Sequence, residues 1–296
     1  TPAADRTSAL GLVGAAFGLG FVFGPAIGGL LASDLAVSLA RGVLPGFVPV
    51  TPFSLPSFAA AGFSFLALVA AAAFLEEPDR IRTSAGRVTF VSQFRAALAD
   101  ATLRPLVVAF FLTSLSFAGI TVMFVPFLAD FFGYDATAAA TFLAYIGALG
   151  IVNQGVLVGR LSGVFGIRRV VQAGTVSLFL ACFLLAAAPL AGTAPLLDSA
   201  PAWMTGGLVV LVVFGALISF GNGAVTVGLA ALVSKGATGS QQGSAFGVTQ
   251  GAGSLGRTIG PPLAAAAYTL VYWSPFVAGA LLLVPVAVLL RRKSGR

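Results

Sequence analysis

The chain has 296 residues, of which 58% are hydrophobic and only 8% carry a charge. Because soluble domains carry about 25% charged residues, this composition excludes a water-soluble enzyme, a disordered tail and a nucleic-acid-binding domain, despite a formal net charge of +7. The chain contains no histidine, which excludes a histidine-ligated metal site and a Ser-His-Asp triad. We therefore predict an all-α polytopic membrane protein that lies mainly in lipid, with no metal, no cofactor and no nucleic-acid partner.

The predicted elements follow from the length of the apolar runs, because a membrane-spanning helix needs about 20 largely apolar residues. Runs bounded by charges, prolines or turn residues predict eight spans, at roughly 9–33, 56–75, 105–129, 137–158, 170–190, 204–230, 244–268 and 272–290. The segment 34–55 contains three prolines and is predicted to be a loop without a helix. In 76–104, apolar residues recur at helical spacing after Phe90, which is typical of a short interfacial amphipathic helix, although a solvated linker fits equally well.

The basic residues predict the orientation of these spans, because cytoplasmic loops carry an excess of Lys and Arg. With a cytoplasmic N-terminus, nearly all of the sixteen basic residues fall on the inside. Arg41 falls outside, and Arg257 falls within a span. Both tryptophans, Trp203 and Trp273, then lie at the outer interface, where aromatic residues gather. The positive charge is thus a topology signal.

An internal repeat predicts how the spans are grouped. Residues 8–30 align with residues 244–266 without a gap, and a Gly-Pro pair occurs at the same depth in both. Each repeat is followed by one more span and then a basic segment. We therefore expect residues 1–75 to hold the last two helices of a first bundle, 76–104 to connect the halves, and 105–296 to form a complete six-helix bundle. If the halves are equal, four further spans precede Thr1.

Parallel halves of six helices are typical of the major facilitator superfamily of secondary transporters, and two segments of this chain carry the resemblance. Residues 20–29 match the G-x-x-x-G-P-x-x-G-G pattern that family members with antiporter activity carry on their fifth helix, at Gly20, Gly24, Pro25, Gly28 and Gly29. Residues 159–169 resemble the basic cytoplasmic loop between helices eight and nine, at Gly159, Arg160, Gly166, Arg168 and Arg169. The chain is most similar to the last eight helices of twelve-helix drug/proton antiporters of the tetracycline-efflux type.

The resemblance implies proton-coupled efflux of an amphiphilic small molecule or drug by alternating access. It also implies a location in the plasma (inner) membrane and a monomeric full-length form. The alternatives are uptake or metabolite transport, for example of a sugar, by a relative of the same fold, or a membrane protein that does not transport. A membrane-embedded enzyme would need a cluster of catalytic side chains near one interface, and the sequence contains no such cluster.

Within the signature, Gly20, Gly24 and Gly28 are spaced by four residues and lie on one helix face. Small residues there permit close helix packing, and Pro25 favours a kink. The residues alone are consistent with generic tight packing. The resemblance implies a helix at the interface between the halves, which flexes during alternating access.

Arg257 is the most informative single residue, because it lies about 20 Å into its span. A mid-bilayer arginine costs roughly 2.5–3.5 kcal/mol on insertion scales, so we expect it to face protein or a water-filled cavity. We favour a substrate or coupling contact over a purely structural role. No acid of the eight spans lies deep enough to be its obvious partner, and a coupling carboxylate is expected in the helices before Thr1.

Other polar residues within the spans are weaker candidates. Gln250 lies two helical turns before Arg257 on the same face and is predicted to line the same surface. Asn153, Gln154 and Asn222 are candidates for substrate contacts, although helix–helix hydrogen bonding is the preferred interpretation of each. Hydroxyls in the third span are compatible with a cavity wall, at Thr113, Ser114, Ser116 and Thr121.

Overall fold

The computed structural model describes residues 23–24, 27–28, 30–74, 89–192, 204–237 and 242–291, and its regular elements in these ranges are helices. The chain divides into two compact units. One contains residues 23–88, and the other contains residues 1–22 together with 89–296. The all-α fold class predicted from the composition is confirmed.

The smaller unit contains two described helices, α2 (Asp34–Val43) and α3 (Ser54–Phe74). Helix α2 corrects the prediction of a loop over 34–55. Ser33 caps it by accepting a hydrogen bond from the amide of Ala36 at 3.3 Å, and Asp34 lies in the first turn, where a negative charge complements the helix dipole. The three prolines follow the helix. They therefore end it before Pro45, and they do not prevent it.

Five of the described helices are long and apolar enough to cross a membrane: Ser54–Phe74, Leu103–Phe132, Ala138–Phe165, Ile167–Ala191 and Gly206–Gly236. They confirm five of the predicted spans. Ser274–Leu290 is a shorter apolar helix at the last predicted span. The predicted span 244–268 is also a helix, but its polar residues keep it out of this apolar set. The first predicted span lies mostly outside the described residues.

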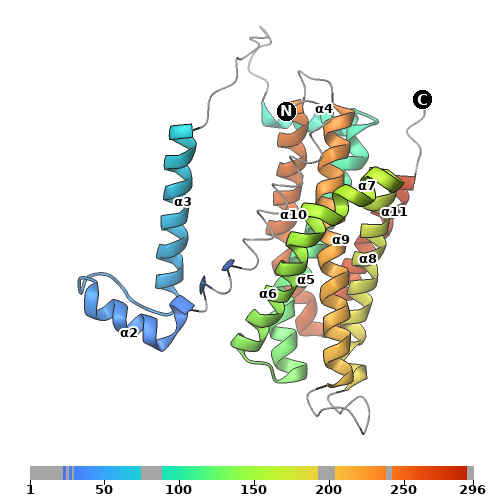
Figure 1. Cartoon of the computed structure of the whole chain (residues 1–296). Coiled ribbons are helices and arrows are strands. Elements are labelled where there is room, and N and C mark those ends of the chain that lie inside the picture. Colours follow the sequence, from blue (N-terminus) through green and yellow to red (C-terminus); the bar gives the residue numbers. More distant parts are fainter. Residues whose placement is uncertain are drawn as a thin grey trace. The chain divides into compact units, whose positions relative to one another are not determined.

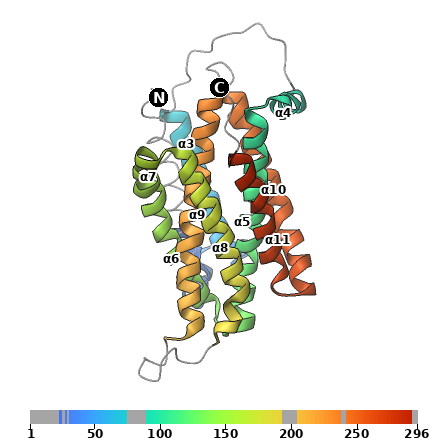
Figure 2. The ribbon, with the colours of Figure 1, turned by 90° about the vertical axis from the view of Figure 1, so that its right-hand side faces the viewer.

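The larger unit is a helical bundle in which consecutive long helices run in opposite directions (Figures 1 and 2). Its elements are α4 (Phe90–Ala99), α5 (Leu103–Phe132), α6 (Ala136–Val152), a π-helical turn η1 (Asn153–Leu157), α7 (Val158–Phe165), α8 (Ile167–Ala187), a 3₁₀ turn η2 (Ala188–Ala191), α9 (Gly206–Gly236), α10 (Gln242–Leu270) and α11 (Ser274–Arg291). Helices α6 and α7 form one long rod with η1 between them. The described part of the bundle therefore contains six long rods and the short helix α4.

Short polar side chains begin these helices by capping their free amides. Asp100 accepts hydrogen bonds from the amides of Thr102 and Leu103, at 2.7 and 2.9 Å, before α5. Asp135 caps α6 through the amide of Ala138 at 2.8 Å, and Thr205 caps α9. These contacts satisfy donors that a helix N-terminus leaves open. Most acidic residues of the described bundle are thus used at helix ends.

The bundle is held by two tightly packed helix pairs, α5 with α10 and α8 with α9, and α11 packs against both α5 and α8. Small residues permit the close approach. A Cβ on Gly256 of α10 would lie 2.6 Å from the carbonyl oxygen of Phe111 in α5. A Cβ on Gly174 of α8 would lie 2.6 Å from the Cβ of Ala224 in α9. Packing between small residues is a principal source of helix association in lipid.

The structure corrects the predicted cytoplasmic loop at 159–169. Helix α7 runs to Phe165 and α8 begins at Ile167, so only Gly166 lies outside a helix. Gly166 has a φ of 83°, in the left-handed region that favours glycine. The sequence-based boundary was set where the apolar run ends, but Arg160 and Leu161 are good helix formers. The rods therefore continue beyond the apolar segment.

Helix α4 confirms the helical interpretation of the segment after Phe90. It packs against the beginnings of α5 and α10, at one end of the bundle (Figure 2). The hydroxyl of Ser244 in α10 donates a hydrogen bond to the side-chain oxygen of Gln93 at 2.9 Å. The structure does not describe residues 75–88, so the rest of the predicted connector lies outside the described part of the chain.

In the described bundle, most basic residues lie at one end, and three of the tyrosine and tryptophan residues lie at the other. The basic end is the one where α4 packs, and it also holds the start of α5, the α7–α8 junction and the end of α9 (Figure 1). Its described basic residues are Arg95, Arg104, Arg160, Arg168, Arg169 and Lys235. The α5–α6 and α10–α11 connections at the other end carry Tyr134, Tyr272 and Trp273. This is the distribution on which the predicted orientation depends, although the orientation itself stays a prediction.

Candidate functional site

The larger unit contains an elongated cavity between α5, α6, η1, α9 and α10. Its two adjoining parts have empty volumes of about 550 and 970 Å³, which include space open to solvent, and they share the lining residues Phe117, Gln154 and Asn222. Along α5 the lining runs from Phe110 to Phe124, which corresponds to about 21 Å of helix. We call this space the central cavity, with an apolar end near Phe124 and a polar end near Arg257.

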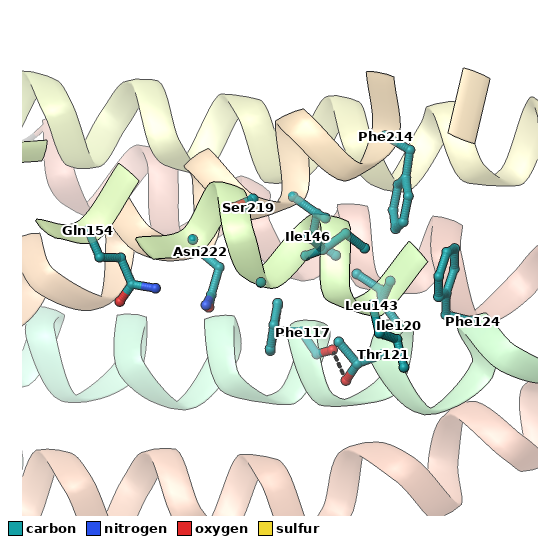
Figure 3. Close-up of a pocket in the computed structure, with 13 residues that line it drawn as sticks. Phe117, Ile120, Thr121, Phe124, Leu143, Ile146, Gln154, Phe214, Ser219 and Asn222 are labelled. Carbon is teal, nitrogen blue, oxygen red and sulfur yellow. Dashed lines mark hydrogen bonds between the residues drawn. The ribbon is translucent and has the colours of Figure 1, made fainter. Parts of the chain in front are cut away.

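The apolar end is lined by aliphatic and aromatic side chains, which project from three helices toward one another (Figure 3). The rings of Phe124 in α5 and Phe214 in α9 lie 5.2 Å apart between centroids. Leu143 and Ile146 reach the same space from α6. Aromatic walls of this kind bury flat apolar groups well.

Gln154 and Asn222 form the transition to the polar end (Figure 3). Gln154 belongs to the π-helical turn and is only 6% exposed. It packs closely on α9, since a Cβ on Gly223 would lie 2.8 Å from its Cγ. The amide oxygen of Asn222 accepts a hydrogen bond from the hydroxyl of Thr226 at 3.4 Å. Both predicted candidates therefore line the cavity.

Asn153 does not line the cavity, although it precedes Gln154 directly. Its amide nitrogen donates a hydrogen bond to the hydroxyl of Ser219 in α9 at 3.1 Å, and it is 8% exposed. This contact is the helix–helix hydrogen bond that the sequence analysis preferred for these amides. Both residues belong to the π-helical turn η1 and approach α9, but only Gln154 also lines the cavity.

Arg257 and Gln250 line the polar end from α10, as their helical spacing predicted. A nitrogen of the Arg257 guanidinium, Nη2, donates a hydrogen bond to the Ser254 hydroxyl at 3.0 Å. No ion pair joins Arg257 to a carboxylate of the described residues. Arg257 lies about 20 Å from either end of α10, so its charge occupies the middle of the bundle.

The hydroxyls of α5 differ in what they contact. Thr113 and Ser114 line the polar end and Thr121 lines the apolar end. Thr121 is satisfied by the carbonyl oxygen of Phe117 at 2.9 Å. Ser116 faces away from the cavity and donates to the carbonyl oxygen of Gly279 in α11 at 3.0 Å. Its prediction as a cavity residue was wrong.

The hydroxyl of Thr113 is unusual because its oxygen is buried and has no hydrogen-bond partner among the described residues. The side chain is 6% exposed. A buried hydroxyl without a partner is costly, whereas Thr175 and Thr249 bond to carbonyls of their own helices. Thr113 therefore stands out as a buried hydroxyl whose hydrogen-bonding capacity is unused among the described residues.

Of the two predicted motifs, only 159–169 lies wholly within the described residues. Of the signature, Gly24 and Gly28 are helical, while Gly20, Pro25 and Gly29 lie outside the described part of the chain. The residues of the second motif lie at the basic end of the bundle and are not among the cavity lining: Gly159, Arg160, Gly166, Arg168 and Arg169. Neither motif contributes to the central cavity in the described residues.

The apolar end of the cavity was not predicted from the sequence. Phe residues are abundant, with 26 in the chain, and no periodicity separates those in a pocket from those in lipid. Phe58 and Phe183 are exposed on the outside, whereas Phe124 and Phe214 face each other. The only signal was that both lie on helices that also carry polar residues.

The described residues contain no group of three or more His, Cys, Asp or Glu that could hold a metal ion. The single cysteine, Cys182, is fully buried in the helix-packing core. The described carboxylates of this unit, on Asp100, Asp130 and Asp135, are not among the cavity lining. Asp130 accepts a hydrogen bond from the hydroxyl of Tyr268 at 2.8 Å, at the aromatic end.

Comparison with known proteins agrees with this architecture. The model of the family described as the Major Facilitator Superfamily matches residues 1–210. The tetracycline resistance protein, class D, of Salmonella ordonez is 29% identical over 264 residues, which make up 89% of this chain and 58% of that protein. This chain thus spans little more than half the length of that relative.

A solved structure gives the same fold. The crystal structure of the human organic anion transporter MFSD10 (TETRAN) matches with a TM-score of 0.69, at 21% identity, over 98% of this chain and 65% of that one. At this identity the likeness concerns the fold alone. Together with the family match, it accounts for the helical bundle.

Proposed function

The chain belongs to the Major Facilitator Superfamily, and from that premise we propose that it is a secondary active transporter that exports an amphiphilic small molecule or drug. Export is driven by protons that move in the opposite direction. The relative named for tetracycline resistance supports a drug as the substrate. The matched antiporter signature, of which Gly24 and Gly28 are described as helical, supports proton exchange.

The observation that carries this proposal is the two-ended cavity. An amphiphile has an apolar body and a polar group, and the central cavity offers an aromatic wall at Phe124 and Phe214 and polar side chains at Gln154, Asn222 and Arg257. Ligand sites in transporters of this kind lie near the middle of the bilayer, between the two halves. The position of the cavity in the middle of the described bundle supports a role in substrate binding.

We further propose that the basic end of the bundle is cytoplasmic and that the protein lies in the plasma (inner) membrane as a monomer. Residues 1–75 then supply helices to one half, 76–104 connect the halves, and 105–296 form the other. In this arrangement the glycines of 20–29 lie at the interface between halves, where close packing and a proline kink permit alternating access.

Transport in everted membrane vesicles tests the proposal. The intact protein is expressed in an efflux-deficient host, the vesicles are energised with a proton gradient, and accumulation of tetracycline is followed. We expect accumulation that collapses when an uncoupler is added. Uptake of tetracycline only into right-side-out vesicles would favour the alternative of an importer, and no uncoupler-sensitive accumulation in either orientation would contradict drug/proton exchange.

A further inference from the structure

We propose that the polar end of the central cavity is an anion subsite, and that the transported amphiphile carries a carboxylate or sulfonate that binds Arg257. This inference rests on the proposed function, because it assigns a substrate class to the cavity that the transporter uses. The substrate would therefore be negatively charged, a property that neither the composition of the chain nor the apolar end of the cavity specifies.

The charge of the cavity lining favours an anionic ligand. Arg257 is the one charged residue in its lining among the described residues. Its hydrogen bond to Ser254 is to a neutral hydroxyl, and no described carboxylate of this unit lines the cavity. A charge at this depth is costly unless a counter-charge approaches it. An anionic substrate would supply that counter-charge on binding.

The position of the Arg257 guanidinium also favours an anion. It lies over Gly253, because a Cβ on that residue would be 3.3 Å from Nη1 of Arg257. The same Cβ would lie 3.1 Å from the hydroxyl oxygen of Ser114 on α5. The absence of a side chain at Gly253 therefore leaves room for the guanidinium beside a second hydrogen-bond donor. Two donors from different helices can hold an anion between them.

The polar end of the cavity contains further hydrogen-bond donors besides Arg257. Thr113 lines the same part of the cavity, and its hydroxyl lacks a partner among the described residues. Gln250 adds a side-chain amide to the same lining, two turns before Arg257 on α10. Guanidinium, hydroxyl and amide groups are all hydrogen-bond donors. A carboxylate or sulfonate accepts several such bonds at once, and its charge makes the bond from the guanidinium stronger than a neutral acceptor would.

The dimensions of the cavity give the spacing of the ligand's two ends. Ser114 and Phe124 are ten residues apart on α5, which corresponds to about 15 Å. A molecule that fills both ends thus carries its anionic group about 15 Å from an aromatic or aliphatic body.

A matched pair of fluorescent amphiphiles tests the subsite. The anionic probe is 11-(dansylamino)undecanoate, and the neutral probe is its carboxamide, which has the same body and length. The intact protein is placed in phosphatidylcholine nanodiscs at pH 7.4, and the signal of protein-free nanodiscs is subtracted. We expect the wild-type protein to bind the carboxylate at least about tenfold more tightly than the carboxamide, since hydrogen bonds to charged groups carry this much affinity.

Three variants locate that preference. Arg257→Gln keeps a polar side chain but removes the charge, and it should lower carboxylate affinity about tenfold while changing carboxamide affinity less than about twofold. Arg257→Lys should keep the preference. Lys235→Gln removes the same unit charge from an exposed residue in the last turn of α9, outside the cavity, and should bind both probes like the wild type.

Equal affinities of the wild type for the two probes would overturn the proposal, as would an Arg257→Gln variant that weakens both probes alike or a Lys235→Gln variant that loses the preference. If Arg257→Gln does not fold, the wild-type ratio and Arg257→Lys still decide the matter. Transport of the carboxylate probe by the wild-type protein in energised everted vesicles separates the two claims. Charge-selective binding without transport contradicts the proposed function, and transport without charge-selective binding contradicts the anion subsite.

Discussion

At the scale of single residues, two asparagines of the bundle have different surroundings and therefore different expected roles. Asn153 is buried and bonded to Ser219 across the α6–α9 contact. Asn222 is partly exposed in the cavity, and its side chain bonds only along its own helix, to Thr226. The first should contribute to stability, and the second to ligand binding.

Replacing each asparagine by alanine separates these roles. Asn153→Ala should lower the free energy of unfolding by about 0.6–1.7 kcal/mol, the range measured for hydrogen bonds between membrane helices. Asn222→Ala should leave stability nearly unchanged and reduce transport. Thermal unfolding of the two purified variants measures the first effect. A larger loss of stability in Asn222→Ala than in Asn153→Ala would contradict this assignment.

Thr113→Val tests the unpartnered hydroxyl. Valine has nearly the same shape and removes a buried polar group that has no partner, so we expect the ligand-free protein to become more stable by about 1–3 kcal/mol. Thr175→Val is the matched control, because it removes a buried hydroxyl that is bonded to the carbonyl oxygen of Val171. Thermal unfolding compares them. A Thr113→Val variant that is destabilised like the control would show that the hydroxyl has a partner.

The cavity residues of α10 could be predicted from the sequence, whereas those of the π-helical turn and of α5 could be predicted only in part. Arg257 and Gln250 could be predicted because a charge in a span and a seven-residue spacing are local features. Asn153 and Gln154 could not be told apart, because their directions depend on a π-helical turn that hydropathy does not reveal. Ser116 was misplaced for a similar reason, since its partner is a carbonyl group on a distant helix.

At the scale of elements, the contact between α5 and α10 depends on glycines at defined positions. Gly256 and Gly260 place the two backbones close together, since a Cβ on Gly260 would lie 2.7 Å from the carbonyl oxygen of Leu115. In the internal repeat these glycines correspond to Gly20 and Gly24. Their packing in α10 gives a physical reason why the repeat keeps glycine at this depth.

Two alanine substitutions on α10 measure this contact. Gly256→Ala should cost about 1–3 kcal/mol, because its Cβ would meet backbone atoms of α5 and the helices would have to separate. Gly247→Ala on the same helix meets nothing within 4 Å and should be neutral, or stabilise by up to about 1 kcal/mol through helix propensity. Thermal unfolding in the same detergent compares the pair. Equal stability of the two variants would argue against tight packing at Gly256.

Most of the helices could be predicted from apolar length and bounding charges, because burial in lipid leaves few alternatives. Helix α2 was missed because prolines were taken to exclude a helix that ends before them. The helices at 159–169 were missed because basic residues mark the end of the lipid and not the end of the helix. The pairing of α6 with α9 left no signal in one sequence.

At the scale of the whole molecule, the orientation proposed from the basic end can be measured directly. The only native cysteine, Cys182, is fully buried, so single cysteines can be introduced with little background. An impermeant thiol reagent added to intact cells should label Trp273→Cys and should not label Lys235→Cys until the membrane is opened. Labelling of both from outside, or of Lys235→Cys alone, would contradict a cytoplasmic basic end.

The central claim is that the cavity between α5, α6, α9 and α10 is the path of the substrate. Asn222→Cys places a reactive thiol in that cavity, and Val176→Cys places one on the exposed side of α8. Drug transport by energised vesicles is measured before and after reaction with N-ethylmaleimide. Labelling should abolish transport only in Asn222→Cys, and excess substrate should slow this labelling. Unchanged transport after complete labelling of Asn222→Cys would contradict that claim.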